Sequence, residues 1–176
     1  MINLNLGCGR MIIPDFVNID MDPVLNPDMV ADVSNLDGIV EDESVDKIVA
    51  YDVIEHLDRV QIPITLKNWY RKLKRDGVLY LRTNDWDRLI RLYVMGKFLG
   101  HQNPVDFEKL VWHFMCEHEK PGMGHKWGFN KATMEKAILD AGFSLYSFTS
   151  EALLTTALYP HADRCDLTNL LVTAVK

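Results

Sequence analysis

The sequence lacks the features that mark membrane and exported proteins. No stretch approaches the roughly 18 consecutive apolar residues that a membrane-spanning helix needs. The chain does not open with a charged segment followed by an apolar one, so we expect no secretory signal and a cytoplasmic location. Apolar residues make up 48% of the sequence and charged residues 25%, as in ordinary globular proteins. We therefore predict a soluble protein that has no membrane partner.

Closely spaced cysteines and an excess of basic residues are absent as well. The three cysteines lie far apart and form no C-x-x-C pair, so the sequence predicts neither a disulfide framework nor a metal site. The formal net charge is -6, which gives no general attraction to the phosphates of nucleic acid. Nucleic acid is thus a disfavoured partner, and the sequence does not specify an oligomeric state.

The apolar residues that are present predict an α/β protein. Short apolar runs alternate with helical patterns, which is typical of a parallel sheet covered by helices on both faces. Seven strands are expected, at residues 2–6, 16–20, 29–31, 47–51, 78–82, 144–149 and 169–175. A chain of 176 residues suits one core, so we predict a single domain over residues 1–176.

Three helices are predicted from apolar residues at helical spacing. They are expected between Val60 and Leu73, from Asp85 as N-cap to an end at Gly96 or Gly100, and between Asn130 and Gly142. Asp76-Gly77 is expected to stop the first helix.

The segment from His101 to Phe129 differs from the rest of the chain. It contains prolines and glycines together with four histidines and two tryptophans. Because so many helix breakers argue against a continuous element, we predict a loop-rich cover over the substrate at about residues 101–129.

A glycine loop, Gly7-Cys8-Gly9, follows the first predicted strand. Ligands of open α/β sheets bind beyond the carboxyl ends of the strands, and glycines let the backbone approach a ligand closely. Read alone, the loop also fits a simple tight turn. Asp20 ends the second strand, where a carboxylate suits a ribose diol or, alternatively, caps a turn. Asp32 follows the third strand and suits an adenine amino group, with Val33 beside the ring.

The same region does not fit a nicotinamide dehydrogenase. Ile12 stands where a dinucleotide fingerprint needs its third glycine, and no ribose acid follows at the required distance of about 20 residues. Only Arg10 to Asp15 separate the loop from the second strand, so we expect a short turn there and no crossover helix.

Candidate catalytic groups follow the fourth strand. Glu55 and His56 come after Tyr51-Asp52, at the same sheet edge as the glycine loop. His56 is the natural general base, because imidazoles exchange protons near neutral pH. In the alternative interpretation, Glu55 and His56 cap the next helix and hold the strand end. His125, within a glycine-containing aromatic stretch, is the favoured second base.

Taken in order, these motifs resemble those of the class I S-adenosylmethionine-dependent methyltransferases. The matching stretches are Leu4-Asn5-Leu6-Gly7-Cys8-Gly9, Asn18-Ile19-Asp20, Ala31-Asp32-Val33, Ser44-Val45-Asp46-Lys47-Ile48-Val49, Val53-Ile54-Glu55-His56-Leu57 and Leu73-Lys74-Arg75-Asp76-Gly77-Val78-Leu79. The resemblance covers nearly the whole chain. It is strongest to a compact branch in which a strand-ending E-H-L and a late W-G-F recur.

The resemblance implies a Rossmann-like three-layer sandwich with a seven-stranded sheet of order 3-2-1-4-5-7-6, in which strand 7 is antiparallel. It implies S-adenosylmethionine as cofactor and a small molecule or saccharide, methylated at a hydroxyl or amine, as acceptor. The residues expected to bind the cofactor are Asn5, Gly7, Cys8, Gly9, Asp20, Met21, Asp32, Val33, Tyr51, Asp52 and His56. The expected catalytic residues are His56, His125 and Glu55.

One departure from the family pattern concerns the residue two positions before the glycine loop. Many members carry an acid there, whereas this chain has Asn5, which adds no charge. A second hypothesis therefore stands beside the enzyme, namely a non-catalytic domain that binds S-adenosylmethionine or a partner.

Overall fold

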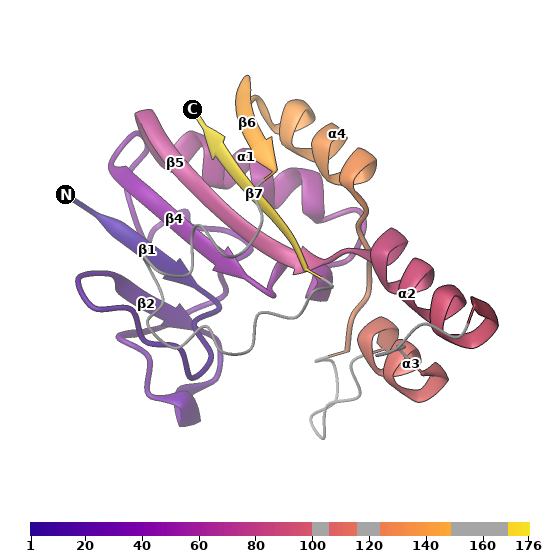
Figure 1. Ribbon diagram of the computed structural model, residues 1–176. Helices are drawn as coiled ribbons and strands as arrows, with labels where there is room; N and C mark the ends of the chain where they lie inside the picture. Colours follow the sequence, from indigo (N-terminus) through magenta and orange to yellow (C-terminus); the bar gives the residue numbers. More distant parts are fainter. Residues whose placement is uncertain (100–105, 116–123, 149–168) are drawn as a thin grey trace.

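A computed structural model describes residues 1–99, 106–115, 124–148 and 169–176 of the chain. These residues form a seven-stranded sheet of order β3-β2-β1-β4-β5-β7-β6 (Figure 1). The strands are β1 (Asn3–Leu6), β2 (Val17–Asp20), β3 (Met29–Val30), β4 (Val45–Tyr51), β5 (Leu73–Asn84), β6 (Leu145–Phe148) and β7 (Asn169–Val175). β7 pairs antiparallel with β5 and β6, and the other pairs are parallel. The predicted order and the antiparallel seventh strand are confirmed.

Two helices, α1 (Ile62–Lys72) and α4 (Lys131–Ala141), lie side by side over one face of the sheet (Figure 1). Their apolar stripes bury Leu66, Trp69, Met134 and Ile138 completely, which explains the helical spacing of these residues in the sequence. The indole nitrogen of Trp69 donates a hydrogen bond of 2.8 Å to the carbonyl of Val33, so α1 is tied to the loop that follows β3.

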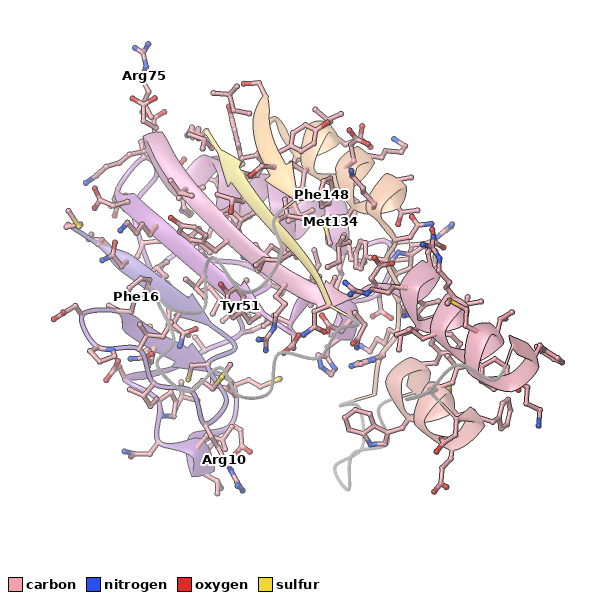
Figure 2. The ribbon with its side chains drawn as sticks, viewed as in Figure 1. Arg10, Phe16, Tyr51, Arg75, Met134 and Phe148 are labelled. Carbon is pink, nitrogen blue, oxygen red and sulfur yellow. The ribbon has the colours of Figure 1, made fainter. Side chains whose placement is uncertain are left out.

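The opposite face of the sheet carries a smaller apolar cluster. Tyr51 and Val49 of β4 pack there with Ile13 and Leu171, and Phe16 lies against them (Figure 2). Because successive strand residues point to opposite faces, Tyr51 lies on the face away from α1.

The boundary between α1 and β5 differs from the prediction. α1 ends at Lys72, and the extended Leu73 already pairs with Val45 of β4. The expected stop signal, Asp76-Gly77, lies instead in a bulge before the pairing resumes at Val78. The Lys72 ammonium lies 2.8 Å from both Asp37 and Asp42, so the last residue of the helix is tied to the chain before β4.

The predicted cover segment contains a helix, contrary to expectation. α3 (Phe107–Met115) has no proline or glycine within it, so the breakers on either side do not interrupt it. α3 packs on α2 (Trp86–Leu99) through Leu110 and Leu89, and the pair projects beyond the carboxyl end of β5 (Figure 1). Within the predicted cover, residues 101–105 and 116–123 lie outside the described residues, whereas 124–129 are described.

Two short 3-10 helices complete the architecture, at Pro23–Leu25 and Ile54–His56. No helix in the part of the chain that the structure describes is long and apolar enough to cross a membrane.

Candidate functional site

A cavity of about 350 Å³ lies beyond the carboxyl ends of β1, β2, β3 and β4. It is lined by Gly7, Gly9, Asp20, Met21, Leu25, Ala31, Asp32, Val33, Ser34, Asp52, Val53, His56, Leu57, Gln61 and Lys126. A groove of about 450 Å³ along α1 shares Ser34 and Gln61 with the cavity but contains neither a glycine nor a histidine. The smaller cavity is therefore the candidate site, at the place where open α/β sheets bind ligands.

The glycine loop forms the floor of this cavity at the end of β1. Gly7 and Gly9 have φ values of 61° and 54°, in the left-handed region that favours glycine. A Cβ atom at Gly7 would lie 2.4 Å from Cγ2 of Val53, so only glycine fits between the loop and the residues that follow β4. The Cys8 amide donates a 3.0 Å hydrogen bond to the carbonyl of Ile19, which fixes the loop to β2.

Asp20 holds the glycine loop and also lines the cavity. Its Oδ2 accepts a 2.8 Å hydrogen bond from the Gly9 amide, and its Oδ1 accepts one of 2.9 Å from Asp22. The side chain is nearly buried. Each carboxylate oxygen has two lone pairs, so Asp20 retains acceptor capacity toward a ligand diol. The turn role and the ligand role proposed from the sequence are compatible.

A polar and an apolar residue stand next to each other after β3. Asp32 is exposed, and its Oδ1 accepts a 2.8 Å hydrogen bond from the Ser34 amide. Val33 is buried and forms part of the cavity wall. This arrangement offers a hydrogen-bond acceptor beside an apolar surface, as a purine ring requires.

The end of β4 supplies a carboxylate that is held by Arg82. Asp52 has a φ of 56°, and its two oxygens contact the Nε and Nη2 atoms of Arg82. The guanidinium also lies over the ring of Tyr51, 4.8 Å from its centroid. Arg82 therefore orients Asp52 at the cavity and balances its charge.

The structure brings together the two histidines that were predicted as bases. The ring centroids of His56 and His125 lie 4.9 Å apart with an edge-to-face angle of 70°. His56 lines the cavity, and Lys126, the neighbour of His125, lines it as well. Two other histidines of the predicted cover segment, His113 and His118, have side chains outside the described part of the molecule.

Glu55 does not occupy the catalytic position that the sequence suggested. Its side chain is 1% exposed and does not line the cavity, and no hydrogen bond to either carboxyl oxygen is found from the part of the chain that the structure describes. Burial, and secondly the charge of Asp52, raise the pKa of this carboxyl to about 8. A group in this position cannot touch an acceptor. Its backbone carbonyl, however, accepts hydrogen bonds of 2.8 and 3.1 Å from the amides of Lys126 and Trp127.

Three residues predicted to bind the cofactor lie outside the cavity lining. The side-chain amide of Asn5 donates hydrogen bonds to the Met11 carbonyl at 2.7 Å and to Oδ1 of Asn18 at 2.9 Å, so it holds the turn after the glycine loop. Cys8 is buried, and the pKa of its thiol is raised to about 11 by burial and by Asp20 and Asp28. Tyr51 lies on the face of the sheet that points away from α1, in the smaller apolar cluster.

Several lining residues were missed from the sequence, namely Leu25, Ala31, Ser34, Val53, Leu57, Gln61 and Lys126. Ser34, Val53 and Leu57 follow strand ends, so their proximity in sequence to predicted site residues was a usable signal. Lys126 comes from a distant segment, and only the fold places it here.

Comparisons with known proteins agree with this geometry. A family described as a methyltransferase domain matches residues 15–81. No curated protein matches the sequence significantly.

The fold is similar to that of solved methyltransferases. A SAM-dependent methyltransferase from Archaeoglobus fulgidus superposes with a TM-score of 0.62 at 15% identity, over 99% of this chain and 85% of that chain. A second, from Mesorhizobium loti, has the same TM-score and identity, over 99% of this chain and 90% of that chain. The family match to residues 15–81 and the order of the sheet agree with the resemblance of the motifs to class I S-adenosylmethionine-dependent methyltransferases, and the chain has their fold.

Proposed function

We propose that this methyltransferase binds its cofactor in the 350 Å³ cavity and methylates a hydroxyl or amine of a small molecule or saccharide. The observation that carries the proposal is the cavity itself, which joins the glycine loop, three strand-end acids and His56 in one space. The acceptor class rests on the sequence resemblance to the compact branch. The single-domain organisation and the cytoplasmic location stay predictions from the sequence.

The cavity residues suit the parts of S-adenosylmethionine. Asp20 offers acceptors to the ribose diol, while Asp32 and Val33 suit the adenine. Gly7 and Gly9 line the cavity where the methionine part would lie, and Asp52 offers a carboxylate to its ammonium group. When bound, the cofactor supplies an electrophilic methyl carbon on a sulfonium.

His56 is the residue placed to take a proton from the acceptor. An acceptor hydroxyl or amine loses a proton as its oxygen or nitrogen gains the methyl group, and a general base removes that proton. His56 lines the cavity, and His125 lies against its ring. We therefore assign His56 as the base and His125 as its neighbour in the acceptor region.

Isothermal calorimetry with S-adenosylmethionine and S-adenosylhomocysteine tests the cofactor site. Binding of both compounds is expected, and an absence of binding to both would contradict the proposal. Binding of the cofactor without transfer to any acceptor would instead favour the non-catalytic domain.

Transfer of a tritiated methyl group to a panel of hydroxyl and amine compounds identifies the acceptor. With an acceptor in hand, His56→Ala and His125→Ala are each expected to reduce turnover while cofactor affinity persists. The exposed Lys136→Ala serves as control. Full turnover in both histidine variants would remove the proposed base.

A further inference from the structure

Residues Gly124–Phe129, called here the His125 segment, are held by three different elements. The His125 amide donates a 3.0 Å hydrogen bond to the Met115 carbonyl at the end of α3. The amides of Lys126 and Trp127 both donate to the Glu55 carbonyl, beside His56. The Phe129 carbonyl accepts a 2.9 Å hydrogen bond from the Trp86 amide at the start of α2. These hydrogen bonds fix the position of the His125 segment next to the residues that follow β4.

Gly128 lies directly against the indole of Trp86. A Cβ atom at Gly128 would lie 1.9 Å from Cε2, 2.2 Å from Cδ2 and 2.3 Å from Cζ2 of that ring. Ordinary contacts of this kind begin at 3.4 Å, so any side chain there must displace the segment or the indole. The indole itself packs on Phe114 of α3, with ring centroids 4.3 Å apart. It therefore has a neighbour that resists its movement.

We infer that Gly128 and Trp86 are positioning residues. Their close contact sets how near the His125 segment lies to the start of α2, and so keeps the ring of His125 against the ring of His56. His125 lies three residues from Gly128, in a segment whose amides donate hydrogen bonds before the contact and whose Phe129 carbonyl accepts one after it. A shift of Gly128 away from the indole must therefore move the segment against the Glu55 carbonyl. The catalytic meaning of this contact rests on the proposed function, whereas the contact between the two imidazoles is measurable without any reaction.

The test is the nuclear Overhauser contact between the ring protons of His56 and His125 in isotope-labelled protein. The wild-type protein is expected to show this contact, and Gly128→Ala is expected to lose it. Affinity for S-adenosylhomocysteine is expected to persist, because Lys126 is the one described residue of the segment that lines the cavity, whereas the glycine loop, Asp20 and Asp32 lie outside the segment. Gly38→Ala is the matched control, since Gly38 has open space around it but a φ of 80°. It strains the backbone and is expected to leave the imidazole contact in place.

A second pair of variants keeps the inference falsifiable if Gly128→Ala does not fold. Trp86→Leu removes the ring that the new Cβ would strike, so adding Gly128→Ala to Trp86→Leu is expected to lower the melting temperature no further. If Gly128→Ala lowers the melting temperature equally in the presence of Trp86 and in the Trp86→Leu background, the inference is overturned. A preserved contact between the two imidazoles in folded Gly128→Ala would overturn it as well. Neither result depends on the identity of the base, which the His56→Ala and His125→Ala activities decide separately.

Discussion

Asp20 shows how one side chain serves both the fold and the site. Its oxygens accept hydrogen bonds from the amides of Gly9 and Asp22, and it lines the cavity. The carboxylate therefore shapes the glycine loop before any ligand arrives. A ligand diol bound there meets an acceptor that is already oriented.

We predict that Asp20→Ala weakens binding of S-adenosylhomocysteine by about tenfold or more, through the loss of charge-assisted hydrogen bonds and of the fixed loop. Asp20→Asn is the matched control, since it keeps an acceptor for the Gly9 amide but removes the charge. An intermediate loss is expected for it. Calorimetry measures both, and unchanged affinity in Asp20→Ala would leave Asp20 with the turn role alone.

Glu55 is the second residue whose environment has a measurable consequence. Burial raises the pKa of its carboxyl from the usual 4.5 to about 8, so the folded protein holds the proton more tightly than the unfolded chain does. Such a group contributes stability that is fully present below pH 4.5 and is lost as the pH rises through 8.

We therefore predict that the free energy of unfolding falls between about pH 4.5 and pH 8, by on the order of a few kcal/mol from this group. Glu55→Gln has no proton to lose and is expected to flatten this dependence. Urea denaturation at several pH values gives the comparison, with the exposed Glu41→Gln as control. Equal pH slopes in wild type and Glu55→Gln would show that Glu55 is not the responsible group.

At the scale of elements, α4 shows the strongest agreement between local sequence and structure. Asn130 caps its start, accepting a 2.9 Å hydrogen bond from the Thr133 amide, and the Thr133 hydroxyl accepts one of 3.0 Å from the Asn130 amide. Gly142, with a φ of 113°, ends the helix. Both ends were predicted, because capping depends on residues that are neighbours in the sequence.

Asn130→Ala is expected to destabilise the protein by about 1 kcal/mol, because the amides of the first turn of α4 lose their partner. Urea denaturation is the measurement, and the exposed Ser144→Ala, just beyond the same helix, is the control. A loss no larger than that of the control would mean that the cap adds little to the stability of the packed helix.

α3 and the start of β5 were not predicted correctly. Nine residues between breakers formed a helix because packing on α2 compensates for the short length, and packing is not readable from composition. β5 begins at Leu73 and not at Val78, because Leu73 pairs with Val45 of β4, a segment far away in the chain.

At the scale of the whole molecule, the sheet order places β1 between β2 and β4. The glycine loop, Asp20, Asp52 and His56 consequently meet at one edge although the sequence separates them. A ligand that binds across this edge contacts several elements at once and stabilises the folded state only.

S-Adenosylhomocysteine at about 100 times its Kd is expected to add about 2.7 kcal/mol to the free energy of unfolding. For a chain of this size, that corresponds to a rise in melting temperature of roughly 5 to 10 °C. Thermal denaturation monitored by circular dichroism gives the shift, with NAD as the comparison ligand. A shift with NAD and none with S-adenosylhomocysteine would contradict the assignment of the cavity.

The sequence by itself determined the features that depend on neighbouring residues or on strand ends. These are the seven strands and their order through the family resemblance, the caps of α4, the glycine loop, and the acids Asp20 and Asp32. Only the tertiary structure decided that His125 meets His56, that Glu55 is buried, and that Asn5 and Tyr51 turn away from the cavity. The physical reason is that burial and contact are properties of segments far apart in the chain, which local spacing and residue chemistry do not encode.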